Sequence, residues 1–127
     1  MTRFVVPAWY RGLGWILAPL LELAGSRRTG PWTASACAPT WIHAASLGEL
    51  KGALRLLEAL PPTHPVFLTS STVAGLDLLK RQHPQHPSSL LPLDSSSVVA
   101  KFLDAIHPSS AVFFESEAWP CLLARLR

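Results

Sequence analysis

The chain has 127 residues, of which 49% are hydrophobic and 15% are charged, so it is long enough for one small globular domain with a core. Its net charge of +3 comes from residues 1–40, where four arginines accompany one glutamate; residues 41–127 hold seven basic and seven acidic side chains. Because this balanced part has no Lys/Arg cluster with interleaved aromatic residues, its composition argues against a nucleic-acid partner.

The cysteines and histidines do not form a recognisable metal site. Cys37 and Cys121 are far apart in sequence and have no partner at Cys-x-x-Cys spacing, which predicts two free thiols in a reducing compartment. His83 and His86 lie in a segment rich in proline and serine without neighbouring carboxylates. We therefore expect no metal and no other cofactor.

The first 25 residues are aromatic and apolar. The apolar run between Arg11 and Glu22 has ten residues, whereas a membrane-spanning helix needs about 20. A signal peptide is disfavoured because Pro19 and Glu22 interrupt the region where cleavage should occur. The pattern favours an arm at the membrane interface, and the alternative is a helix packed on the core of the domain. Residues 26–38 resemble a linker, so we place the domain boundary between residues 1–38 and 39–127.

Short apolar runs alternate with segments of helical periodicity from residue 39 onward. We predict strands at 39–44, 65–69, 90–94 and 111–114, helices at 47–60, 73–81 and 98–106, and a loop at 83–89. Strands and helices that alternate in this order form an α/β fold, a parallel sheet with flanking helices and right-handed crossovers.

The first predicted strand is followed by Ser46, Leu47, Gly48 and Glu49. This spacing fits a capping box, in which Ser46 and Glu49 bind each other's backbone N–H groups at the start of a helix. Glycine is unfavourable inside a helix, so Gly48 indicates close approach by backbone or ligand. Ligands of open α/β sheets bind where strand ends meet helix N-termini, which makes Glu49 a candidate site residue as well.

Polar residues also follow the second and fourth predicted strands. Ser71 and Thr72 either cap the next helix or bind a phosphate or sugar. Glu115 and Glu117 come directly after four apolar residues and are expected at the same edge of the sheet as Glu49. Carboxylates grouped in this way can divide the labour of general base and charge stabiliser; alternatively, they cap a helix or bind loop N–H groups.

Four ordered pieces of this sequence resemble the N-terminal domain of the Kdo transferases. These enzymes move 3-deoxy-manno-octulosonic acid (Kdo) from CMP-Kdo to a lipid A precursor in the assembly of the lipopolysaccharide core. The pieces are His-x-x-Ser-x-Gly-Glu at 43–49, Thr-x-x-Thr-x-x-Gly at 69–75, Pro-Leu-Asp at 92–94 and Glu-x-Glu-x-Trp-Pro at 115–120. The family's basic stretch before the first strand is reduced here to residues 27–30.

The resemblance implies a partial Rossmann-like, acceptor-binding domain of a GT-B glycosyltransferase at the cytoplasmic face of the inner membrane. It implies that Glu49 is the general base and that Glu115 stabilises the transition state. The expected acceptor-binding or supporting residues are His43, Ser46, Gly48, Ser71, Thr72 and Glu117. The chain ends before a CMP-Kdo-binding domain, so we do not expect it to catalyse transfer alone. The alternatives are a non-catalytic α/β binding module and the N-terminal domain of another GT-B enzyme.

Overall fold

The computed structural model of the chain describes residues 6–13, 16, 27–33, 36–114 and 119–126. The chain divides into two compact units. One unit contains residues 33–91 and 106–116 and holds the sheet; the other contains residues 1–32, 92–105 and 117–127. We describe each unit by itself.

The sheet unit is built from strands and helices that alternate along the chain. Its elements are β1 (Thr40–Ala44), α2 (Leu47–Ala59), β2 (Val66–Ser70), α3 (Val73–Gln82), β3 (Ser88–Leu90) and β4 (Ser110–Phe114). This confirms the predicted strands at 39–44, 65–69 and 111–114 and the predicted helices at 47–60 and 73–81, each end to within one residue. Helix α2 ends at Ala59, before Pro61 and Pro62, as expected where proline disfavours helical backbone in the residue before it.

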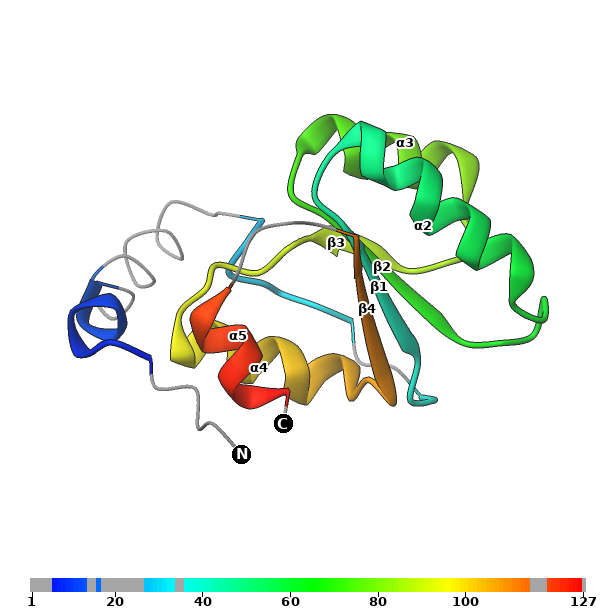
Figure 1. Cartoon of the computed structure of the whole chain (residues 1–127). Helices are drawn as coiled ribbons and strands as arrows, with labels where there is room; N and C mark the ends of the chain where they lie inside the picture. The colour runs from blue at the N-terminus through cyan, green and yellow to red at the C-terminus, as the bar shows by residue number, and fades with distance from the viewer. Residues whose placement is uncertain (1–5, 14–15, 17–26, 34–35, 115–118, 127) are drawn as a thin grey trace. The chain divides into compact units, whose positions relative to one another are not determined.

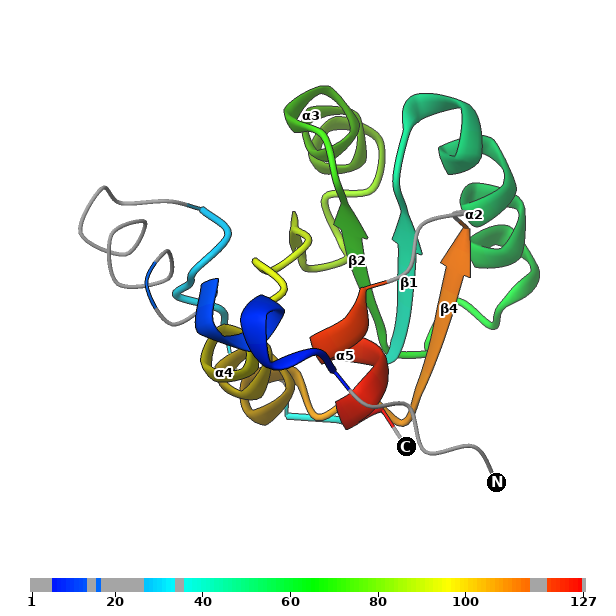
Figure 2. The ribbon, with the colours of Figure 1, turned by 60° about the vertical axis from the view of Figure 1, so that its left-hand side comes forward.

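All neighbouring strands are parallel, in the order β3-β2-β1-β4. Figure 2 shows β2, β1 and β4 side by side with their arrowheads pointing the same way. The prediction of a parallel α/β sheet is therefore confirmed. The strand order reverses between β1 and β4, where Ala44 is paired with Phe114 at the carboxyl ends. In open α/β sheets, this reversal is where ligands bind, outside the carboxyl ends of the strands.

Helices α2 and α3 cover one face of the sheet (Figure 1). The core of this layer joins strand and helix side chains: Ile42, Ala44, Val66 and Leu68 from the strands, and Leu50, Ala53, Leu57 and Leu79 from the helices. Side chains alternate between the faces of a strand, so Trp41 and His43 lie on the opposite face. There both rings contact Phe113, with ring centroids 5.0 and 5.9 Å away.

The third strand differs from its prediction. We predicted strand residues 90–94 after a loop at 83–89, but β3 runs from Ser88 to Leu90. The Leu91 N–H still donates to the Ser70 carbonyl at 2.9 Å, and Pro92 then has no N–H to continue the ladder. The polar Ser88 and Ser89 fit this strand because it lies at the edge of the described sheet and leaves both residues half-buried.

The second unit contains a helical segment at residues 8–13, α5 (Pro120–Arg125) and α4 (Ser96–Ile106) without its last residue. The predicted helix at 98–106 is confirmed, with two additional residues at its start. Its Phe102 is fully buried and meets Trp32 edge-on, with ring centroids 5.2 Å apart. The Leu93 N–H donates to the Arg28 carbonyl at 2.9 Å. Arg28 and Trp32, which precede position 38, therefore pack within this unit; the domain boundary at 38 stays a prediction.

Candidate functional site

Two neighbouring strand-to-helix turns form the described part of the carboxyl edge. The first joins β1 to α2 through Ala45 and Ser46, and the second joins β2 to α3 through Ser71 and Thr72. Because β1 and β2 are paired from Thr40–Val66 to Ala44–Ser70, both turns leave the sheet at the same level. The first turn also lies beside the strand reversal, since the Ala45 N–H donates to the Phe114 carbonyl at 3.4 Å.

Glu49 completes a capping box at the start of α2. Its Oε2 accepts hydrogen bonds from the Ser46 N–H at 3.0 Å and from the Ser46 hydroxyl at 3.1 Å, while the Ser46 Oγ accepts from the Glu49 N–H at 3.4 Å. The structural alternative for this pair is thus correct. The capping box leaves the Glu49 carboxylate accessible, because Ser46 is exposed and Glu49 is only half-buried.

Gly48 has no described protein neighbour that requires glycine. A Cβ placed on it would come closest to the Ser46 Oγ, at 3.8 Å, which is an ordinary contact distance. The sequence offered two reasons for this glycine, close backbone or a close ligand. The first reason is not found among the described residues.

The β2–α3 turn also uses its hydroxyls as caps. The Thr72 Oγ1 accepts from the Gly75 N–H at 3.1 Å, and the Ser70 Oγ accepts from the Thr72 N–H at 3.3 Å. Thr72 is exposed and Ser71 is half-buried. A Cβ on Gly75 would collide with the Ser70 hydroxyl, so packing alone explains this glycine.

Below the edge, His43 is fully buried and bonded through both ring nitrogens. Its Nδ1 lies 2.8 Å from the Thr69 Oγ1, and its Nε2 lies 3.3 Å from the Ser71 Oγ. The Trp41 indole N–H donates to the same Thr69 oxygen at 2.8 Å. We did not assign Trp41 and Thr69 to the site from sequence. Their polar groups on buried strands, which need partners, were the available signal.

Glu115, Glu117 and Asp94 are not among the residues of these two turns. Glu115 and Glu117 lie outside the described residues, so their placement at the edge stays a prediction. Asp94 was predicted at the end of the third strand, but it lies four residues beyond the end of β3. Its carboxylate is buried and accepts from the Tyr10 hydroxyl and from the Cys121 and Leu122 N–H groups, at 2.8 to 3.1 Å. Asp94 therefore caps α5, where Trp119 provides no side-chain cap.

The hydrogen bond to Asp94 comes from Tyr10, which lies in the N-terminal arm. Burial, together with the bond to Asp94, raises the pKa of Tyr10, so the phenol stays protonated as a donor. On the same segment, Trp9, Leu13 and Ile16 are between 51% and 72% exposed. Residues at i, i+4 and i+7 share one side of a helix. In the described part of the chain, no helix combines the length and apolar character needed to cross a bilayer.

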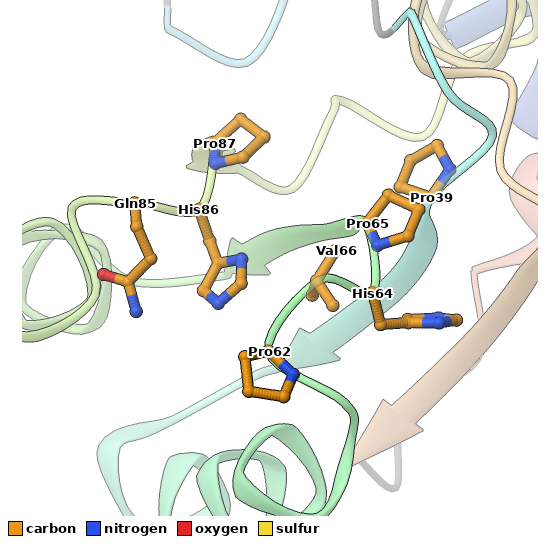
Figure 3. Close-up of a pocket in the computed structure, with 8 residues that line it drawn as sticks. All are labelled: Pro39, Pro62, His64, Pro65, Val66, Gln85, His86 and Pro87. Carbon is orange, nitrogen blue, oxygen red and sulfur yellow. The ribbon is translucent and has the colours of Figure 1, made fainter.

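The amino edge of the sheet holds a pocket of about 260 Å³ (Figure 3). Four prolines, two histidines, Val66 and Gln85 line it; Pro39, Pro65 and Pro87 each directly precede a strand. His64 is used within the sheet unit, because its Nε2 lies 2.8 Å from the Thr40 Oγ1. Burial lowers the pKa of His86, and so does the nearby His83. The pocket lies at the edge opposite the two turns that hold Glu49 and Thr72.

Comparison with known proteins assigns the fold and its turns to a family. The family model described as 3-deoxy-D-manno-octulosonic-acid transferase (kdotransferase) matches residues 20–127. This chain belongs to the Kdo transferase family.

Three relatives named 3-deoxy-D-manno-octulosonic acid transferase illustrate the match. The protein from Bordetella pertussis is 35% identical over 111 residues, which cover 82% of this chain and 25% of the relative. The protein from Rickettsia prowazekii is 38% identical over 87 residues, covering 65% of this chain and 19% of the relative. The protein from Aquifex aeolicus is 32% identical over 87 residues, covering 65% and 24%. The chain thus spans about a fifth to a quarter of the length of these relatives.

Proposed function

We propose that this chain is the acceptor-side part of an enzyme that moves Kdo from CMP-Kdo to a lipid A precursor in lipopolysaccharide core assembly. The observation that carries the proposal is the position of Glu49. It lies half-buried at the first turn of α2, beside the strand reversal between β1 and β4. Membership of the Kdo transferase family supports the reaction type.

Glu49 acts as the general base in this proposal. Its described side-chain bonds all use Oε2, so the capping box fixes the carboxyl group while Oε1 accepts the proton of the acceptor hydroxyl. The hydroxyl oxygen attacks the sugar as CMP leaves. The start of α2 supports this role because the N-terminal end of a helix stabilises a negative charge. A capping residue and a base are therefore compatible in one side chain.

The two turns provide groups suited to an amphiphilic acceptor. Ser46, Ser71 and Thr72 offer hydroxyls, with His43 behind them in the core. Leu47 and Val73, the first residues of α2 and α3, are 48% and 47% exposed. Gly48 has no described neighbour closer than 3.8 Å to its Cβ position, which supports close approach of the acceptor in this proposal. We assign acceptor binding to these turns.

The roles of Glu115 and Glu117 are proposed from the sequence alone. Phe114, which precedes them, ends β4 and is paired with Ala44 at the carboxyl edge. We assign stabilisation of the transition state to Glu115 and acceptor support to Glu117. We assign CMP-Kdo binding to the part of the relatives' length that this chain does not match.

The decisive experiment is Glu49→Gln in a chimera that joins this chain to the remaining part of the Bordetella pertussis relative. Loss of a general base should lower turnover by about 10²- to 10⁴-fold. Glutamine can still complete a capping box, so the free energy of unfolding should barely change. Glu58→Gln, at an exposed position of the same helix, is the matched control. Kdo transfer at the parental rate by Glu49→Gln would restrict Glu49 to its capping role.

The non-catalytic alternative has its own signature. If the chain is only a binding module, the parental chimera binds acceptor without transferring Kdo, and Glu49→Gln changes nothing.

The N-terminal arm places the enzyme at the cytoplasmic face of the inner membrane in this proposal. Trp9, Leu13 and Ile16 support it because they are exposed at helical spacing next to the exposed Arg11. The chain should bind anionic vesicles more strongly than neutral ones, and added salt should weaken that binding. Co-sedimentation measures both effects. Trp9→Ser should weaken the binding, whereas equal recovery with neutral and anionic vesicles at every salt concentration would reject the electrostatic contribution.

A further inference from the structure

One buried carboxylate joins the N-terminal arm to helix α5 within the second unit (Figure 2). The Asp94 Oδ2 accepts from the Tyr10 hydroxyl at 2.8 Å and from the Cys121 N–H at 3.1 Å. Its Oδ1 accepts from the Leu122 N–H at 2.8 Å, and the side chain is only 8% exposed. The helical segment at residues 8–13 and the first turn of α5 therefore bind the same side chain, which holds these two elements next to each other.

The shared carboxylate brings two exposed arginines, Arg11 and Arg125, close together. Arg11 directly follows Tyr10, and Arg125 lies one turn beyond Cys121 on the same side of α5. Burial raises the pKa of the Cys121 thiol, whereas the charges of Arg11 and Arg125 lower it, so both guanidinium groups lie near this thiol. Within the described residues, neither guanidinium group has a hydrogen-bond or ion-pair partner.

The net charge of the chain is concentrated in this second unit. The unit holds seven basic and four acidic residues, whereas the sheet unit holds four of each, so the whole net charge of +3 belongs to the second unit. One of its four acidic residues is Asp94, which is buried and already accepts from three donors. Charge complementarity therefore favours an anionic partner.

The second unit also exposes most of the large apolar side chains. In the described part of the chain, six large hydrophobic residues are at least 38% exposed, and four of them lie in this unit. They are Trp9, Leu13 and Ile16 of the arm and Leu123 of α5. Exposed tryptophan and leucine beside arginine are typical of elements that lie in the interface of an anionic bilayer, where lipid phosphates meet an apolar interior.

We propose that the arm and α5 together form one surface that binds anionic lipid headgroups, which rests on the membrane placement in the proposed function. We call it the arm–α5 surface, and its residues are Trp9, Arg11, Leu13, Ile16, Leu123 and Arg125. The two arginines bind lipid phosphates, and the apolar side chains enter the headgroup boundary. Tyr10 is a positioning residue, because its bond to Asp94 holds the arm beside α5 so that both arginines meet the bilayer.

The contribution of α5 is tested by co-sedimentation of the 127-residue chain with phosphatidylglycerol vesicles and with phosphatidylcholine vesicles. Arg125→Gln should weaken binding to phosphatidylglycerol roughly fivefold, the effect of one basic residue at an anionic surface, and should not change binding to phosphatidylcholine. Arg81→Gln is the matched control. Arg81 is an exposed arginine in the last turn of α3, in the sheet unit, and its substitution changes the net charge equally. Equal binding by the two variants would overturn the inference.

The positioning role of Tyr10 is tested by a double-mutant cycle. Tyr10→Phe keeps the ring but removes the hydroxyl that binds Asp94, so it should weaken binding to phosphatidylglycerol vesicles by roughly two- to tenfold, the range of one hydrogen bond. If the bond holds the arm beside α5, Arg125→Gln should cost less in the Tyr10→Phe background than in the parent. Strictly additive effects would refute the positioning role.

The same measurements separate this inference from the proposed function. If Trp9→Ser weakens binding to phosphatidylglycerol vesicles while Arg125→Gln behaves as Arg81→Gln does, the arm binds the membrane alone and the arm–α5 surface is wrong. If the parental chain does not bind these vesicles, the membrane placement in the proposed function is wrong, and the inference falls with it. The role of Glu49 in Kdo transfer is decided by the chimera and depends on neither result.

Discussion

The two turns at the carboxyl edge have nearly the same local design. Each places a hydroxyl residue at the N-cap, Ser46 or Thr72, and each follows it with an exposed apolar residue. Each also carries a glycine in the first turn of its helix, at the second position in α2 and the third in α3. From sequence alone, the glycines look equivalent, since either one costs the helix stability.

The two glycines differ in the side chains that surround them. Gly75 lies against the side chain of Ser70, which its own N-cap region uses as an acceptor, and the Thr72 Oγ1 would also be only 3.0 Å from an added Cβ. Gly48 would place its Cβ 3.8 Å from one hydroxyl. Among the described residues, Gly75 thus has a neighbour that requires glycine, and Gly48 has none. This contrast supports our proposal that the acceptor approaches the first turn more closely than the second.

Gly75→Ala should have the largest effect on stability. The added methyl meets Ser70, whose backbone is fixed in β2, so overpacking of about 1–3 kcal/mol should outweigh a gain in helix propensity of up to about 1 kcal/mol. We expect a net loss in the free energy of unfolding, measured by urea denaturation. Adding Ser70→Gly should relieve part of it. A single variant as stable as the parent would remove the distinction between the two glycines.

The fold could be read from sequence because its signals are local. Alternating apolar runs and helical periodicity predicted the strands and helices, and four such units imply a parallel sheet. The third strand was misplaced because Leu90 and Leu91 attracted the prediction, whereas edge pairing tolerates Ser88 and Ser89 and Pro92 ends the ladder. Apolarity is a weak guide to the limits of an edge strand.

The site was predictable only in part, since its contacts link distant residues. The sequence predicted two roles for Glu49, a capping role and a role in the site, and the capping box confirms the first. The hydrogen bonds of the His43 ring join residues 26 and 28 positions apart, and the bond from Tyr10 to Asp94 spans 84 positions. Sequence motifs placed His43, Ser71 and Asp94 near strand ends. They did not reveal that His43 and Asp94 are buried and act through neighbouring groups.

Gly48→Ala should have a smaller effect on stability and the opposite sign. Because no described residue lies close to its Cβ position, alanine should stabilise the start of α2 by about 0.5–1 kcal/mol. In the chimera, the same methyl should obstruct the acceptor and lower its turnover by roughly tenfold or more, because small displacements at a reacting centre are costly. Urea denaturation and transfer assays on the same variant separate the two effects. A variant that gains stability and keeps full activity would show that no substrate comes close to Gly48.

Gly52→Ala, one turn further along α2, should have the smallest effect and sharpens the comparison. Its Cβ would lie 3.1 Å from Cδ1 and Cε1 of Phe114, closer than at Gly48, but the half-buried ring can yield by a few tenths of an ångström. The gain in helix propensity and the cost of this shift should nearly cancel, leaving the free energy of unfolding within about 0.5 kcal/mol of the parent. A double-mutant cycle tests the cancellation. In a Phe114→Leu background the ring is absent, so Gly52→Ala should stabilise by up to about 1 kcal/mol. Equal effects in both backgrounds would mean that the ring does not oppose the methyl group, and that the gain in propensity is offset elsewhere in α2.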